Sequence, residues 1–285
     1  MLLLLLFGSE EAESKSKLKF TSKTICILLL QGLALIKLGG SVVTFKEKPL
    51  AANIDAIQGI SRALTQLGVP IIIVHGGGSF GHYWSVKYDM HTKSANYDLH
   101  GVSIVHESMI ALNQIIVNSM IGMGLNPYGM PPSALATGHK PMLARIRHVY
   151  AMAQSKVIPV TFGDIVYVGG TKYSILSGDA LMTILARALR PLRIIFATNV
   201  DGVYKDGVRR ELVEEIRIED KSKSIEYFKA GTDTTGGMQR KVTEAFKIAS
   251  HGMDVVIING LIPERIIEAA RGTVNVGTVV MGRKS

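Results

Sequence analysis

The sequence has very little cysteine and few charged residues for its length. Cys26 is the single cysteine among 285 residues, which excludes an internal disulfide and a zinc site built from cysteines. This usage fits a reducing compartment such as the cytoplasm. Charged residues make up 19% of the chain and hydrophobic residues 47%, a balance that argues against a largely disordered chain and predicts a compact globule.

Apolar runs long enough to cross a membrane are also missing. Met1–Phe7 and Ile25–Ile36 are apolar, but each is far shorter than the roughly 20 residues that a spanning helix needs. The polar stretch between them offers no convincing signal-peptidase site. We therefore expect residues 1–32 to be a poorly ordered, dispensable extension, and we expect no stable membrane insertion.

The basic residues lack the pattern of a nucleic-acid-binding surface. The net charge is +9, yet pairs such as Arg145/Arg147 and Arg209/Arg210 are scattered, without interleaved aromatic residues or a recognisable module. We therefore expect no nucleic-acid partner. A basic field of this kind attracts small anions such as ATP and phosphate esters.

Short apolar runs bounded by glycine or proline alternate with helical patterns, which is typical of an α/β protein with a mostly parallel sheet covered by helices. Strands are expected at residues 33–38, 71–75, 126–130, 157–161, 193–198 and 255–258, with a final edge strand at 278–281. Long helices are expected at residues 50–67 and 98–123, and a hairpin at 165–175 should turn at Gly169-Gly170.

A glycine-rich turn follows the expected strand at 71–75. Its glycines are Gly76, Gly77, Gly78 and Gly81. They remove side chains that would hold an anion away from backbone N–H groups, and the next helix should add its positive end. His75 should brace this loop, whereas His82 can point into it. The spacing, with Asp98 further on, also matches a dinucleotide fingerprint, so a Rossmann dehydrogenase stays open at this point.

Four further segments place polar residues at expected element ends. They are Lys37-Leu38-Gly39-Gly40-Ser41 with Lys46, Ser177-Gly178-Asp179, Thr198-Asn199-Val200-Asp201-Gly202, and Thr235-Gly236-Gly237-Met238-Gln239-Arg240-Lys241. A lysine at a strand end can neutralise charge on a transferring phosphoryl group. Ser177 is placed to cap a helix, and Asp179 to orient lysines. A dehydrogenase would leave all four segments unexplained, and its fingerprint should follow the first strand of the unit.

Taken in order, these motifs resemble the amino acid kinase superfamily and, within it, the isopentenyl phosphate kinases. The resemblance covers about residues 33 to 281, and the subfamily rests on Ser79-Phe80-Gly81-His82, Gly101–His106 and Asn259-Gly260 with Pro263-Glu264-Arg265. It implies a three-layer αβα sandwich with a mostly parallel central sheet over residues 33–285. The phosphoryl-acceptor lobe would span about 33–190 and the nucleotide lobe about 191–285. No Walker A motif is present, so ATP would be held by this other scaffold.

The resemblance also implies transfer of the γ-phosphoryl group of ATP to isopentenyl phosphate, with Mg²⁺ arriving on the nucleotide and no metal ligand from the chain. The catalytic residues would be Lys37, Lys46, His82 and Asp179. The acceptor would be bound by Gly77, Gly78, His82 and Gly178, with Val102, Val105 and Met109 as an apolar wall. The nucleotide would be bound by Lys37, Gly39, Gly40, Ser41, Gly78, Thr198, Asn199, Asp201, Gly237 and Lys241. We also expect a homodimer.

Phe45 and Asn199 stand where similar kinases usually carry aspartates, which leaves the positioning of the first loop and of the nucleotide open. Kinases of the same fold that act on a fosfomycin-like phosphonate, UMP or an acylglutamate remain alternatives. An amino-acid acceptor would call for an arginine that clamps its carboxylate. A non-catalytic nucleotide-binding regulator is the alternative from another class, and the retained Lys37, Lys46 and Lys241 argue against it.

Overall fold

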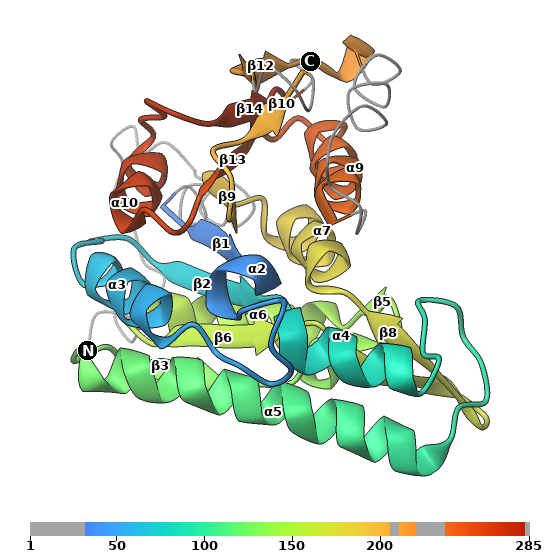
Figure 1. Cartoon of the computed structure of the whole chain (residues 1–285). Coiled ribbons are helices and arrows are strands. Elements are labelled where there is room, and N and C mark those ends of the chain that lie inside the picture. The colour runs from blue at the N-terminus through green and yellow to red at the C-terminus, as the bar shows by residue number, and fades with distance from the viewer. Residues whose placement is uncertain (1–31, 206–210, 221–236, 283–285) are drawn as a thin grey trace, which may run out of the picture.

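The computed structural model describes residues 32–205, 211–220 and 237–282 (Figure 1). Nearly all of the expected N-terminal extension, including Cys26, lies outside the described residues. So do Thr235 and Gly236, the first two residues of the last glycine motif.

An eight-stranded sheet forms the centre of the described structure. In sheet order its strands are β12 (Glu215–Ile216), β14 (Thr278–Val280), β13 (Val255–Asn259), β9 (Arg193–Thr198), β1 (Ala34–Leu38), β2 (Ile71–His75), β6 (Ile158–Phe162) and β3 (Pro127–Gly129). Neighbouring strands are parallel except for β13 with β14. Each strand expected from the sequence is present.

The prediction that residues 278–281 form the edge strand is wrong. β12 pairs in parallel with β14 through Glu215 and Val279 and covers that edge. With only two residues, β12 is too short to show the alternation of polar and apolar residues that identifies a strand.

The order of the strands reverses at β1. The chain builds β2, β3 and β6 on one side of β1 and then returns to place β9, β13 and β14 on the other. In open α/β sheets, ligands bind in the crevice at the carboxyl ends of the strands where the order reverses. The fold therefore predicts a ligand site at the carboxyl ends of β1, β2 and β9.

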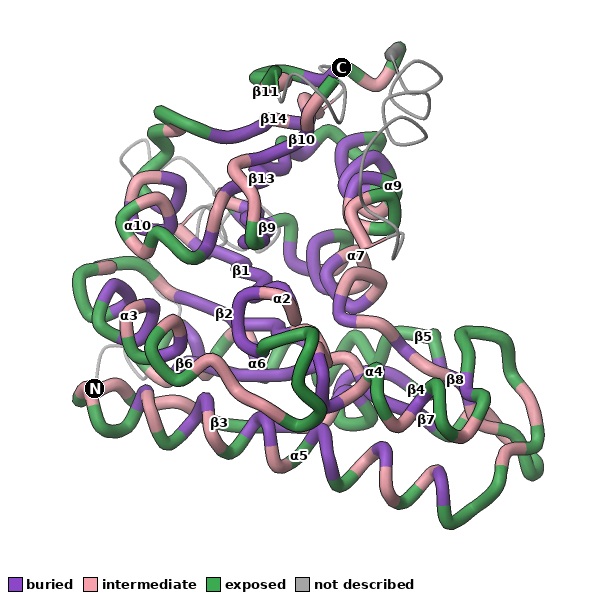
Figure 2. Tube along the Cα trace, viewed as in Figure 1, coloured by how far each residue is buried: buried purple, intermediate pink, exposed green. Residues whose placement is uncertain are grey.

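Helices cover both faces of the sheet, which confirms the three-layer αβα sandwich. Leu35 of β1 packs in one buried core with α6 (Leu143–Gln154), α7 (Gly178–Leu189) and α9 (Gly237–Ala249). The adjacent Ala34 and Ile36 pack in a second core with α2 (Gly40–Val43), α3 (Ile54–Leu64), α5 (Leu99–Gly122) and α10 (Pro263–Arg271). Figure 2 shows the buried strands between these layers. None of the described helices is both long and apolar enough to span a bilayer.

Two helix boundaries show how local capping decides where a helix starts. The helix expected at 50–67 begins only at Ile54, because Asn53 caps it by accepting a hydrogen bond from Ala56 N at 3.3 Å, and it ends at Leu64. Leu50 has a φ of 53°, which no α-helix accommodates. α5 begins as expected, because Asp98 accepts a hydrogen bond from Gly101 N at 2.9 Å.

A hairpin outside the main sheet completes the surroundings of the site. β7 (Asp164–Gly169) and β8 (Lys172–Leu176) are antiparallel, and Gly169 and Gly170 turn with φ values of 123° and 61°, as predicted. The hairpin lies beside the N-terminal half of α5, and α4 (Gly78–Lys87) packs on the same helix (Figure 1). The smaller elements are β4 (Ala136–Thr137) with β5 (Lys140–Pro141), β10 (Val203–Tyr204) with β11 (Leu212–Val213), and the 3₁₀ turns Pro132–Ala134 and Ile218–Asp220.

Candidate active site

A pocket of about 440 Å³ lies at the carboxyl ends of β1 and β2. Its lining comes from residues within 37–46, 76–85, 105–109, 163–179 and 237–241, so segments far apart in the sequence meet there. The pocket brings together the four residues predicted to be catalytic, which are Lys37, Lys46, His82 and Asp179.

The two glycine segments are in direct backbone contact at one side of the pocket. A Cβ atom on Gly40 would lie 2.3 Å from Gly78 N, and one on Gly76 would lie 2.7 Å from Gly40 N. Gly78 also has a φ of 49°, in the left-handed region that glycine adopts without strain. Side chains at these positions would push the two loops apart.

Thr44 joins these loops by hydrogen bonds, and sequence reasoning missed it. Its buried Oγ1 donates to Gly40 O at 2.8 Å and accepts from Ser79 N at 2.9 Å. The hydroxyl therefore ties the segment that carries Lys46 to the start of α4. The only sequence signal is a hydroxyl residue four positions after Gly40, where it can bond back to that carbonyl.

Among the described helices, three of more than two turns begin at the pocket. Gly78 starts α4, Gly178 starts α7 and Gly237 starts α9, and all three residues line the pocket. Ser177 caps α7 by accepting a hydrogen bond from Ala180 N at 3.2 Å, as expected. The positive dipole ends and the backbone N–H groups of these first turns make this a strong environment for phosphate groups.

Lys37 and Asp179 form a buried ion pair in the pocket. Their charged atoms are 3.0 Å apart, and the side chains are only 3% and 14% exposed. Asp179 Oδ1 accepts no aligned hydrogen bond from the described residues, so the contact is ionic. A buried lysine needs such a partner, and the carboxylate fixes where the ammonium points. This arrangement supports the prediction that Asp179 orients an active-site lysine.

Lys46 and His82 differ from this pair because both are exposed at the pocket. Neither side chain makes a hydrogen bond or ion pair with any residue in the described part of the chain. Their donors are available to a bound anion.

His75, the last residue of β2, braces the glycine loop that follows it, as the sequence predicted. Its Nδ1 lies 3.1 Å from Gly76 O, its Nε2 lies 3.1 Å from Asn113 Nδ2, and its ring stacks on Phe162. Complete burial lowers the pKa of His75 to about 4, and the charge of Lys37 adds to this effect. The neutral ring donates to Gly76 O and accepts from Asn113.

An apolar wall faces the polar end of the pocket. Val105 and Met109 contribute from α5, as predicted, and Ile165 and Ile175 contribute from the β7–β8 hairpin. Val102 does not line the pocket and instead packs against a small cluster behind it. The hairpin was predicted from its glycine turn, but nothing in the sequence placed it against α5.

A histidine–carboxylate contact lies at the same wall. His106 Nδ1 is 2.5 Å from Asp164 Oδ2, and Asp164 lines the pocket. The side chain of Asp164 is 1% exposed and that of His106 is 41% exposed. The hydrogen bond with Asp164 raises the pKa of His106, and burial raises the pKa of Asp164. No role was predicted for either residue.

Four residues predicted to bind nucleotide do not line this pocket, namely Gly39, Thr198, Asn199 and Asp201. Asp201 accepts hydrogen bonds from Arg265, from Asn259 Nδ2 at 3.1 Å and from Tyr204 Oη at 3.3 Å. The bond from Arg265 is the main reason that the pKa of Asp201 is lowered. Gly40, Ser41, Gly78, Gly237 and Lys241 do line the pocket.

A mostly parallel α/β sheet with lysines, glycines and helix N-termini at its carboxyl edge defines a phosphate-binding protein of the small-molecule kinase class. The chain belongs to the amino acid kinase family, whose family model matches residues 32–259.

Several isopentenyl phosphate kinases are similar to the chain over most of its length. It is 32% identical over 250 residues to the isopentenyl phosphate kinase of Thermoplasma acidophilum, covering 87% of this chain and 100% of that relative. The isopentenyl phosphate kinase of Methanothermobacter thermautotrophicus is 30% identical over 269 residues, covering 88% and 100%. A crystal structure of an isopentenyl phosphate kinase substrate complex matches with a TM-score of 0.71 and 30% identity, over 87% of this chain and 99% of that one.

Proposed function

We propose that this protein transfers the γ-phosphoryl group of ATP to isopentenyl phosphate, giving isopentenyl diphosphate and ADP. The observation that carries the proposal is a single pocket in which Lys46, His82 and three helix N-termini face an apolar wall. A phosphate monoester with a short hydrocarbon tail matches both ends of such a pocket. The similarity to isopentenyl phosphate kinases supports the same reaction.

The chemistry needs charge stabilisation more than a base. A phosphate monoester has a second pKa of about 6, so the acceptor is mostly a dianion at neutral pH and already nucleophilic. The obstacle is repulsion between two anions, and the transition state is loose and in-line. Lys46, His82 and the N–H groups at the start of α4 would hold the two phosphates together, while Asp179 keeps Lys37 directed at them.

The wall distinguishes this acceptor from two of the alternatives, an acylglutamate and UMP. Val105, Met109, Ile165 and Ile175 offer no partner to the carboxylate of an acylglutamate or to the base of UMP. Arg240, the one arginine in the described lining, comes from α9. A non-catalytic regulator would have no need for a pocket lysine such as Lys46, which has no partner among the described residues.

We propose ATP as the donor, with Mg²⁺ carried in on its phosphates. The described residues contain no cluster of three or more His, Cys, Asp or Glu side chains arranged to hold a metal. Asp164 and Asp179, the two carboxylates of the described lining, are held by His106 and Lys37. These residues fit an ion that keeps water and phosphate oxygens as its ligands, and the ion would neutralise charge on the phosphates that it bridges.

The remaining proposals concern nucleotide binding and assembly. Thr198, Asn199 and Asp201 would act on the nucleotide from a lobe at about 191–285, and Gly39 would act on it from the acceptor lobe at about 33–190. We also propose a cytoplasmic homodimer. Exposed Leu99, Ile110 and Ile121 on the outer side of α5 support a dimer, because exposed apolar side chains on one element favour association.

The direct test is ATP consumption with isopentenyl phosphate, dimethylallyl phosphate, fosfomycin, UMP and N-acetylglutamate as acceptors. We expect turnover with the two prenyl phosphates. Faster turnover of UMP, fosfomycin or N-acetylglutamate, or no turnover at all, would sink the proposal.

A second test examines His82. His82→Ala should lower kcat/KM for isopentenyl phosphate by about one to two orders of magnitude, because a hydrogen bond to a charged group is worth roughly 1.5–3 kcal/mol. His82→Gln should recover part of this loss, since an amide still donates one hydrogen bond. His148→Ala, which removes an exposed histidine from α6, is the control. If the alanine and glutamine variants lose the same activity and their melting temperatures fall by the same amount, His82 only holds the loop.

A further inference from the structure

The His106–Asp164 contact joins two elements that carry the apolar wall. His106 follows Val105 on α5, and Asp164 precedes Ile165 on β7, so each member of the pair is the chain neighbour of a wall residue. The 2.5 Å contact is therefore placed where a change in the distance between α5 and β7 would change the separation of Val105 and Ile165.

We propose that His106 and Asp164 form a positioning latch that sets the width of the apolar wall and thereby selects the length of the acceptor's hydrocarbon tail. This inference rests on the proposed function and deepens it, because it assigns tail selectivity to two residues that the phosphoryl-transfer chemistry does not use.

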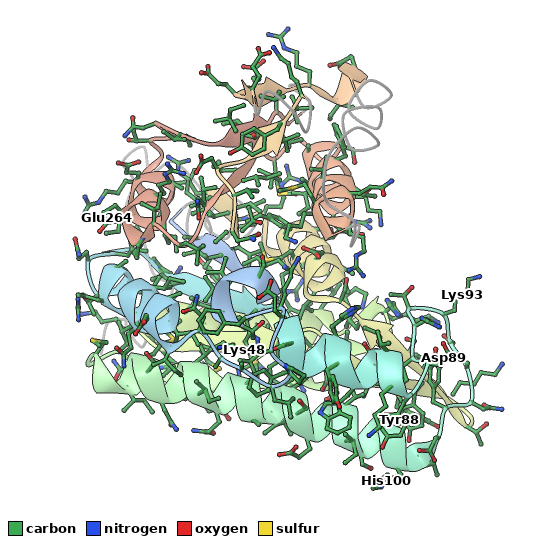
Figure 3. The ribbon with its side chains drawn as sticks, in the orientation of Figure 1. Lys48, Tyr88, Asp89, Lys93, His100 and Glu264 are labelled. Atoms are coloured by element: carbon green, nitrogen blue, oxygen red, sulfur yellow. The ribbon has the colours of Figure 1, made fainter. Side chains whose placement is uncertain are left out.

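Among the described residues, His106–Asp164 is the only hydrogen bond that joins α5 itself to β7. The other hydrogen bonds of the hairpin in this region, such as those between Tyr173 and Ala95, reach the segment before α5. Val105 and Ile165 belong to a small cluster with Met90 that is separate from the two main cores. The other members of that cluster are only partly buried, and they are Trp84, Tyr88, Tyr97, Val102, Tyr173 and Ile175. Figure 3 shows Tyr88 and His100 at this end of the molecule, where their rings meet edge to face. Because apolar packing is limited here, a charge-assisted hydrogen bond between α5 and β7 matters for the distance between these two elements.

Both oxygens of Asp164 are used in a way that suits a latch. Oδ2 accepts from His106, and Oδ1 accepts from the backbone N–H of Ile165 at 2.7 Å. The carboxylate thus fixes the backbone of the wall residue beside it and ties that residue to α5. His106 also offsets a negative charge that would otherwise face the bound phosphates.

The test compares tail selectivity in His106→Ala and His106→Asn. The readout is kcat/KM for a five-carbon and a ten-carbon prenyl monophosphate, together with KM for ATP and the melting temperature. In the alanine variant the ratio of the five-carbon to the ten-carbon value should fall by about tenfold, the low end of what one methylene in an apolar pocket is worth. The asparagine variant should restore most of the ratio, because its amide can donate from nearly the same position as Nδ1.

Using a ratio removes effects that are common to both acceptors. Uncovering the Asp164 charge would weaken binding of either phosphate equally, and partial unfolding would lower both rates equally. KM for ATP should stay within about twofold of the parent value, and His148→Ala should leave the ratio unchanged.

The latch is refuted if the alanine variant keeps the parent ratio, or if both acceptors lose the same factor while the melting temperature falls. It is also refuted if the asparagine and alanine variants behave alike. Failure of the proposed function is a different result, since the unmodified enzyme would then turn over neither prenyl phosphate.

Discussion

The buried histidine beneath the glycine loop makes the protein sensitive to mild acid. Burial lowers the pKa of His75 from its usual 6.5 to about 4. Between these values the unfolded chain binds a proton that the folded protein rejects, so the free energy of unfolding falls as the pH falls through this window. One pKa unit is worth about 1.4 kcal/mol, so the full gap corresponds to about 3 kcal/mol.

The perturbation is His75→Gln, which removes the titrating group but keeps a side chain that can donate to Gly76 O and accept from Asn113. The free energy of unfolding of both proteins would be measured by urea denaturation between about pH 7 and pH 4. The parent protein should lose about 3 kcal/mol relative to the variant over this range. Taking the difference matters because His106, whose pKa is raised, contributes with the opposite sign.

A constant offset between the two proteins is expected, since the variant loses the ring that stacks on Phe162. The reasoning fails if the difference is flat with pH, or if it grows toward acid in favour of the parent. Either result would mean that His75 binds a proton in the folded protein at least as readily as in the unfolded chain.

Three other substitutions test the polar side of the pocket. Lys46→Ala should lower kcat by roughly 10²–10³-fold with a small change in KM, because a charge that acts mainly in the transition state affects the rate. A normal kcat with a raised KM would assign Lys46 to ground-state binding. Thr44→Val should lower kcat by about tenfold because it leaves the Ser79 N–H without its acceptor, and Thr44→Ser should restore kcat. Equal kcat values in the two variants would show that the hydroxyl does not position the loop. Asp179→Asn should lower the free energy of unfolding by about 3 kcal/mol or more, because it removes the counter-charge of a buried lysine. Chemical denaturation that shows no loss of stability would contradict the ion pair.

The strands could be predicted from the sequence because a buried parallel strand is a short, continuous apolar run. Ile71–His75 and Arg193–Thr198 are such runs, and both stand in the structure within a residue of their predicted bounds. The order in which the strands pair could not be predicted, since an apolar run does not determine which strands lie beside it. Glu215–Ile216 shows this limit, because the two residues become a strand only through contact with β14.

Some residues of the candidate site could be predicted from the sequence and others could not. Gly76, Gly78, Lys37 and Asp179 were predicted because glycines and charged residues at element ends have a chemical reason to be there. Thr44, Asp164 and His106 were missed because their importance lies in partners 35 and 58 positions away. Gly101–His106 marked the subfamily, but neither that motif nor the type of residue at Thr44 gives a signal of such a distant partner.

The placement of β1 at the reversal of strand order also constrains how the chain can fold as it is synthesised. Ala34 pairs on one side with Ile71 and on the other with Arg193, so one edge of β1 stays open until most of the chain has emerged. Loop closure over such a separation is slow, and an unpaired apolar strand edge is prone to intermolecular pairing. Nascent chains that stop before Thr198 therefore carry the exposed edge of their own central strand, and they are the species most in need of chaperone protection.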